Sequence, residues 1–110
     1  MKETVSILGS VYKIEHRSQK DDKRLKGLSG YCDAYHQLIV IRNDWKDEVP
    51  SELINEIARH VIVHAFFFES GLWDNSNEYG AAWANNEEMI DWIAIQGPKI
   101  YRAWEEAGVI

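Results

Sequence analysis

The chain has 110 residues, of which 45% are hydrophobic and 27% charged, and it includes five Trp and five Tyr. This length and composition predict one globular domain, residues 1–110, with a single modest core. The formal net charge of -6 argues against direct binding to a nucleic-acid backbone, which requires clustered Lys and Arg. The same charge suits a protein partner with a basic surface.

Cysteine usage and the N-terminal sequence predict a cytoplasmic protein. The single cysteine, Cys32, has no partner for an internal disulfide and is expected to be a small core residue. Residues 1–10 lack the sustained apolar stretch of a signal peptide, and no run approaches the roughly 18 apolar residues of a membrane span. We therefore expect no association with a membrane.

The N-terminal half has the composition of a small sheet. Residues 4–15 are rich in β-branched and aromatic types and are interrupted at Gly9, which predicts one strand or two short ones. Residues 16–29 contain charges of both signs without helical or strand spacing, which predicts an exposed loop with one helical turn. A second strand region follows at 30–44, centred on residues 39–41, with residues 31–35 as the opposing arm of a hairpin. We expect these strands to be mostly antiparallel.

The C-terminal half predicts helices. Apolar residues recur at helical spacing from Glu52 to Ser70, after a start signal at Pro50 and before a C-cap glycine. Residues 73–82 predict a polar loop, and a second helix is expected over residues 83–96. Pro98 is expected to kink this helix or to restart it as a short terminal helix. Three tryptophans of this region are expected in the core, namely Trp83, Trp92 and Trp104.

Two histidines in the first predicted helix have the spacing of a metal-binding pair. His60 and His64 lie four residues apart, which places both imidazoles on one helix face, one turn from each other. Two such nitrogens reach one tetrahedral metal at about 2.0–2.1 Å. The spacing alone also fits a buried helix with one hydrogen-bonded and one exposed histidine.

The second predicted helix begins with acidic residues that suit the same site. Glu87 is positioned to supply a third ligand, and Asp91, one turn further on, is positioned to accept the free ring N–H of a ligating histidine. The alternative is that Glu87, Glu88 and Asp91 form a solvated acidic face, which the dipole at a helix N-terminus favours.

These segments resemble a known family. "HVIVH" followed about two dozen residues later by "NEEMID" resembles the gluzincin branch of zinc metallopeptidases, which carries H-E-x-x-H on one helix and N-E-x-x-x-D on the next. The segments "GYCDAYHQLIVIR", "RHVIVHAFFFESGL" and "WANNEEMIDWIAIQGPKI" also look like a compact version of that fold found among small phage and prophage proteins. The resemblance extends from about residue 7 onward.

The resemblance implies an α+β fold and a zinc site. The fold would be a small, mostly antiparallel sheet packed on two ligand-bearing helices, with a short C-terminal helix after Pro98. His60, His64 and Glu87 would bind zinc, Asp91 would hold a ligating histidine, and Glu88 would replace Glu87 if the helix register differed by one residue.

The sequence departs from the family pattern at the catalytic position. Val61 occupies the place of the glutamate that removes a proton from the zinc-bound water, and valine has no atom that accepts a proton. Glu56, one turn before His60, is a weak candidate for a substitute base. Tyr79, in the loop between the two helices, is a weak candidate for stabilising an oxyanion.

Three hypotheses follow. The first is a zincin-like pseudoenzyme without catalytic residues, of phage origin, which acts by binding a protein, such as a host or anti-phage defence factor, in the host cytoplasm. The second is a weak or active zinc metallopeptidase. The third is a domain in which zinc has only a structural role.

Overall fold

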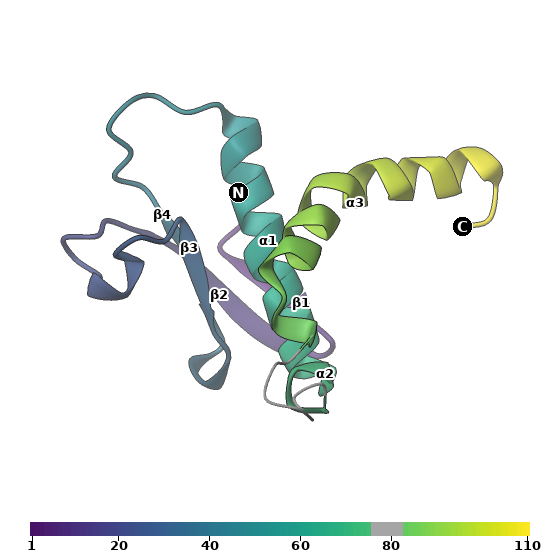
Figure 1. The fold of residues 1–110 in the computed structure, drawn as a ribbon, viewed down its shortest axis with the longest axis horizontal. Coiled ribbons are helices and arrows are strands. Elements are labelled where there is room, and N and C mark those ends of the chain that lie inside the picture. Colours follow the sequence, from purple (N-terminus) through teal and green to yellow (C-terminus); the bar gives the residue numbers. More distant parts are fainter. Residues whose placement is uncertain (76–82) are drawn as a thin grey trace.

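The N-terminal half of the chain forms one four-stranded mixed sheet. The structure, a computed structural model, describes residues 1–75 and 83–110, and Figure 1 shows its ribbon. The strands are β1 (Thr4–Ile7), β2 (Ser10–Arg17), β3 (Gly30–Asp33) and β4 (Leu38–Arg42), in the spatial order β1-β2-β4-β3. The β1–β2 and β3–β4 pairs are antiparallel and the β2–β4 pair is parallel. The expectation of a mostly antiparallel sheet is confirmed.

A tight turn after β1 and a long connection after β2 set the strand order. Leu8 and Gly9 both have positive φ, at 48° and 90°, which is the backbone of a type I′ hairpin turn and explains the break after β1. The loop after β2 contains one 3-10 turn, η1 (Lys23–Leu25), as predicted. This loop carries the chain to the far side of β4, so in the described part of the chain β3 forms an edge of the sheet and pairs with β4 alone.

The core lies between the sheet and the helix α1 (Ser51–Glu69). Alternate residues of β2 and β4 are buried on the face towards α1, and the helix contributes Ala58, Val61 and Ala65, whose spacing of three and four residues marks one helical face. The predicted helix limits agree with the observed ones to within one residue. Pro50 is the N-cap residue, and it makes no side-chain capping bond.

The second long helix, α3 (Glu87–Ala107), begins later than predicted and continues through Pro98. Residues Trp83–Asn85 form the 3-10 turn η3, and the side chain of Asn86 caps α3 by accepting a hydrogen bond from the Met89 amide at 2.8 Å. A short helix, α2 (Leu72–Asn75), follows α1. The expected C-terminal helical extension is therefore the second half of α3.

Pro98 is accommodated because another residue satisfies the carbonyl that it leaves free. A proline has no N–H, so the carbonyl of Ala94, four residues earlier, loses its helical donor. The Nε of Arg59 on α1 donates to that carbonyl oxygen at 2.7 Å. Arg59 thus joins the two helices at the position where the helical hydrogen-bond ladder is interrupted.

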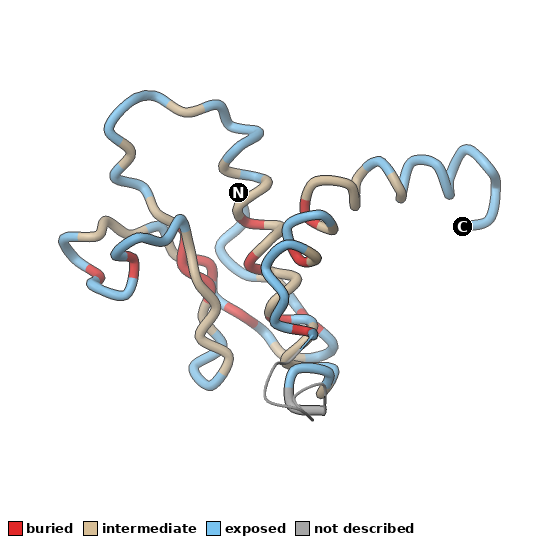
Figure 2. The backbone as a smooth tube through the Cα atoms, in the orientation of Figure 1, coloured by how far each residue is buried: buried red, intermediate tan, exposed pale blue. Residues whose placement is uncertain are grey.

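The second half of α3 extends away from the rest of the molecule (Figure 1). Residues 101–110 are all exposed, as the tube in Figure 2 shows. The radius of gyration is 14.9 Å, against about 13 Å for a compact chain of this length. Trp83, Trp92 and Trp104 are 54%, 56% and 51% exposed, so the prediction that they lie in the core is wrong.

Among residues 1–75 and 83–110, no helix combines the length and apolarity that crossing a membrane requires.

Candidate metal centre

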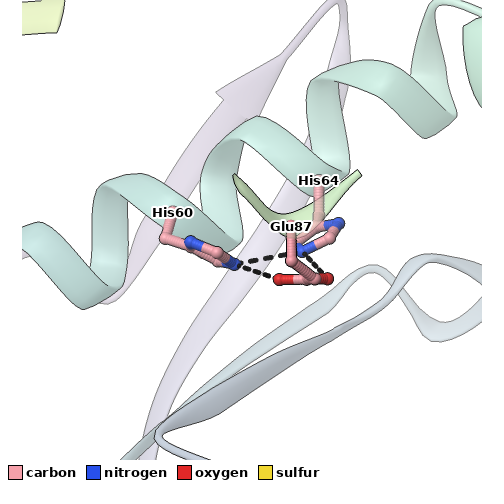
Figure 3. A group of neighbouring side chains, drawn as sticks. All are labelled: His60, His64 and Glu87. Carbon is pink, nitrogen blue, oxygen red and sulfur yellow. Dashed lines mark hydrogen bonds and ion pairs between the residues drawn. The ribbon is translucent and has the colours of Figure 1, made fainter. Parts of the chain in front are cut away.

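His60 and His64 lie side by side on α1, as the spacing predicts. Their ring centroids are 5.0 Å apart and their Nε2 atoms are 3.2 Å apart. Their side chains are only 23% and 20% exposed. The helix therefore directs both Nε2 atoms to one point at its surface (Figure 3).

The first residue of α3 completes the group. Glu87 places one carboxylate oxygen 2.8 Å from the Nε2 of His60 and the other 3.1 Å from the Nε2 of His64. The Asn86 cap fixes the start of α3 at this position. One ligand atom from each of the three residues lies within 4.8 Å of the other two, so these residues are able to hold one metal ion.

These distances suit a zinc ion. With zinc–nitrogen and zinc–oxygen bonds of about 2.0–2.2 Å, tetrahedral ligand atoms are separated by about 3.3 Å. The observed separations of 2.8, 3.1 and 3.2 Å are close to that value. Small side-chain movements would open the group enough to bind the ion.

Asp91 lies on the other side of the His60 ring. Its carboxylate is 3.3 Å from the Nδ1 of His60. If Nδ1–H donates to this carboxylate, the neutral ring has a lone pair at Nε2, and that lone pair faces the carboxylate of Glu87. Two acceptors at 2.8 Å repel each other, so this contact needs either a proton on the Nε2 of His60, which then donates to Glu87, or a metal ion between the two atoms.

His64 is the histidine better prepared to act as a neutral ligand. Burial lowers its pKa from the ordinary value of 6.5, and this effect exceeds the opposing influence of the Glu87 carboxylate. Metal binding requires an unprotonated imidazole nitrogen. A lowered pKa keeps that nitrogen available at neutral pH.

Val61 lies beside this group and faces the sheet. The residue is 2% exposed and belongs to the core between α1 and the strands. A Cβ built on Gly30 of β3 would lie 3.2 Å from Cγ2 of Val61 and 2.7 Å from the carbonyl oxygen of Val40, so only glycine fits at position 30. Val61 also borders a hollow of about 260 Å³ that His60 and Glu87 line.

A larger cleft opens beside the histidines. It has a volume of about 440 Å³ and lies between the edge strand β3 and α1. His60, His64 and Glu87 line one part of it, and an aromatic group formed by Tyr35, Phe68 and Trp73 lines another. The Phe68 ring packs edge-on against Tyr35 at 5.4 Å and lies 6.3 Å from the ring of Trp73.

The other carboxylates considered from the sequence lie outside the group of three. Glu88 points into a separate hollow with Trp83, Trp92 and Met89, so the structure brings Glu87 rather than Glu88 to the histidines. Glu56 lines the 260 Å³ hollow with Val61. Tyr79 lies outside the described residues.

Cys32 lines the cleft from β3. It is half-buried and packs against the core, so the expectation of a small core residue holds in part. Burial raises the pKa of the Cys32 thiol to about 11. At neutral pH the side chain is therefore a protonated thiol rather than a reactive thiolate.

Sequence reasoning missed the residues on the far side of the cleft. Arg24, in η1, lies over the ring of Tyr31 at 4.2 Å and donates to Asp33 at 2.9 Å, and all three residues line the cleft. They belong to a stretch that the sequence assigned to an exposed loop and a strand. The spacing of residues in the sequence does not predict contact between these segments and a helix about three dozen residues away. The one indication in the sequence is the pair of tyrosines in "GYCDAY".

Together these features define an α+β domain with a His-His-Glu group at the junction of its two long helices and an aromatic cleft beside that group. Comparison with models of known protein families, with curated proteins and with solved structures finds no match to this chain. The resemblance to zincins therefore depends on the motifs in the sequence.

Proposed function

We propose that this chain is a zinc-binding, zincin-like domain that has lost its general base and acts by binding a protein. One observation carries the proposal: His60, His64 and Glu87 bring three acceptor atoms to one point, and the neighbouring residue that faces the sheet is Val61. A metal site of this form with an apolar residue at the position of the base suits binding better than hydrolysis.

Three residues would bind the metal and a fourth would orient one of them. His60, His64 and Glu87 would be the ligands, and Asp91 would fix the ring of His60 through its Nδ1–H. Bound zinc would act as a Lewis acid and lower the pKa of a coordinated water to about 7. Without a base at position 61, the rate of peptide hydrolysis is expected to be lower by roughly 10²- to 10⁴-fold.

The cleft supports binding of an extended peptide segment. β3 pairs only with β4, so within the described residues its outer edge has no strand beside it. Such an edge accepts an extended segment through main-chain hydrogen bonds, while pockets beside it accept alternate side chains. The aromatic group of Tyr35, Phe68 and Trp73 suits an apolar side chain of the partner, and the acidic balance of the chain suits basic residues elsewhere in that partner.

The experiment is a metal analysis joined to a binding assay. The purified chain is expected to contain about one zinc per chain and to leave a mixture of peptides uncleaved after long incubation. Photo-crosslinking from position 35 in a bacterial lysate is expected to capture a partner, and Phe68→Ala should reduce that capture. A host or phage-defence protein among the captured partners would agree with the resemblance to phage proteins.

The two remaining hypotheses predict other results. Hydrolysis by the natural sequence that a chelator abolishes would show a working peptidase and would contradict the proposal. If His60→Ala unfolds the chain, and neither the natural sequence nor Phe68→Ala captures a partner, zinc has a structural role only.

A further inference from the structure

The second half of α3 presents an apolar stripe that no other described part of the chain covers. In its first half the helix buries Ile90 and Ala94 against the rest of the domain. The same side of the helix continues with Gly97, Ile100 and Trp104. A Cβ built on Gly97 meets no atom within 4 Å, and Trp104 is 51% exposed. The stripe therefore continues into the exposed end of the helix.

The spacing of this stripe is that of a helix that pairs with another helix. Ile93, Gly97, Ile100, Trp104 and Ala107 follow one another at intervals of four, three, four and three residues, which is the a/d pattern of a two-helix seam. At about 100° per residue, the charged residues of this half lie about 100–160° around the helix from Trp104. They are Lys99, Arg102, Glu105 and Glu106.

The charge distribution favours a second copy of this chain as the occupant. The two cations and two anions of residues 97–110 cancel, so the net charge of -6 lies entirely in residues 1–96. Two copies would repel each other over most of their surface but not at this half of α3. A basic partner, in contrast, would be drawn to the acidic part of the chain rather than to a neutral apolar stripe.

We propose that two copies of this chain associate through antiparallel contact of the second halves of their α3 helices. In an antiparallel pair centred at residue 102, Trp104 of each copy packs on Ile100 of the other, and Gly97 lies opposite Ala107. Large residues thus meet large ones and small residues meet small ones, which lets the helices approach closely. An antiparallel pair also places the two acidic parts, residues 1–96 of each copy, at opposite ends of the contact, whereas a parallel pair would bring them together.

The contact is small, so the dimer depends on concentration. Residues 97–107 span about 16 Å at 1.5 Å per residue, and a Trp buries at most about 250 Å². This is less than the roughly 800 Å² per partner of a standard stable interface. We expect dissociation in the micromolar range or above.

The test is the mass of the full-length chain by sedimentation equilibrium over micromolar to millimolar concentrations. The mass is expected to rise twofold across the series. Trp104→Glu should keep the monomer mass throughout, while Trp92→Glu should dimerise like the natural sequence. Trp92 is the matched control because it is 56% exposed on the same helix and lies about 120° around it from Trp104. Far-ultraviolet circular dichroism should show that both variants remain helical.

A monomer at every concentration would overturn the proposal, as would a dimer that Trp104→Glu leaves intact or that Trp92→Glu also abolishes.

Discussion

The proposed loss of the general base predicts that one substitution restores hydrolysis. Val61→Glu replaces the buried valine with the carboxylate that the zincin pattern has at this position. The hollow of about 260 Å³ that Val61 shares with His60 and Glu87 gives the longer side chain room on the metal side of α1. Three carboxylates line that hollow with it, from Glu56, Glu87 and Asp91. Their negative charge raises the pKa of the new group, as general-base catalysis requires.

We expect Val61→Glu to remain folded and to hydrolyse peptides at a measurable rate. Val61 is 2% exposed, so its replacement loses about 1.5–3 kcal/mol of apolar burial, and desolvation of the new polar group adds about 1–3 kcal/mol. A domain of this size has about 5–15 kcal/mol of stability, so the variant should remain folded. A positioned base contributes roughly 10²- to 10⁴-fold in rate. Zinc-dependent hydrolysis should therefore become measurable while the fold persists.

The assay is hydrolysis of a quenched fluorescent peptide by zinc-loaded protein, with Val61→Gln as the control. Glutamine has nearly the same size as glutamate and disturbs the core to a similar degree, but it does not accept a proton at neutral pH. Val61→Glu is expected to cleave the peptide faster than Val61→Gln by at least about 100-fold. If both variants bind one zinc per chain, remain folded and are equally inactive, the missing base is not what prevents hydrolysis.

Three further predictions concern the residues around the site. Asp91→Asn removes the carboxylate beside His60 and should weaken zinc binding by about 10- to 100-fold at unchanged stoichiometry, measured by competition with a chromophoric chelator; unchanged affinity would contradict the role of Asp91. Arg59→Met leaves the Ala94 carbonyl without its donor and should lower the free energy of unfolding by about 1–3 kcal/mol in urea titrations; an unchanged midpoint would show that solvent satisfies this carbonyl. The lowered pKa of His64 means that the unfolded chain takes up a proton first as the pH falls, so the metal-free protein should lose stability below about pH 6.5. His64→Gln should reduce this pH dependence, and an identical dependence in the variant would show that another group causes it.

The regular parts of the fold could be predicted because local patterns specify them. The apolar period of α1 identified that helix to within one residue at each end. The β-branched residues of β2 and β4 and the turn glycine at position 9 identified the strands. The strand order could not be predicted in the same way, because it depends on where the long connection after β2 carries β3.

The C-terminal half could be predicted in part. The expectation of a kink at Pro98 agrees with the change of direction between the two halves of α3 (Figure 1), which stays one helix because the Arg59 side chain satisfies the carbonyl that Pro98 leaves free. The tryptophans were assigned to the core on residue type alone. Trp104 is exposed because the second half of α3 extends beyond α1, and the stripe spacing that marks a core-facing helix also marks a helix that pairs with another chain.

The candidate site was predictable only in part. The interval of four residues placed His60 and His64 together, and the acidic start of the next helix suggested Glu87, which the structure places within 3.1 Å of both histidines. The choice between Glu87 and Glu88 depended on the position of the Asn86 cap. The aromatic side of the cleft depended on tertiary packing between segments without a common motif.

The central claim is that three side chains form a site for one zinc ion, and isothermal titration of the metal-free chain with zinc tests it most directly. Glu88→Gln is the matched control for Glu87→Gln, since it makes the same change of charge one residue away and outside the group. We predict one zinc per chain for the natural sequence and for Glu88→Gln, and a large loss of affinity for Glu87→Gln. No binding by the natural sequence, or an equal loss in both variants, would contradict the account.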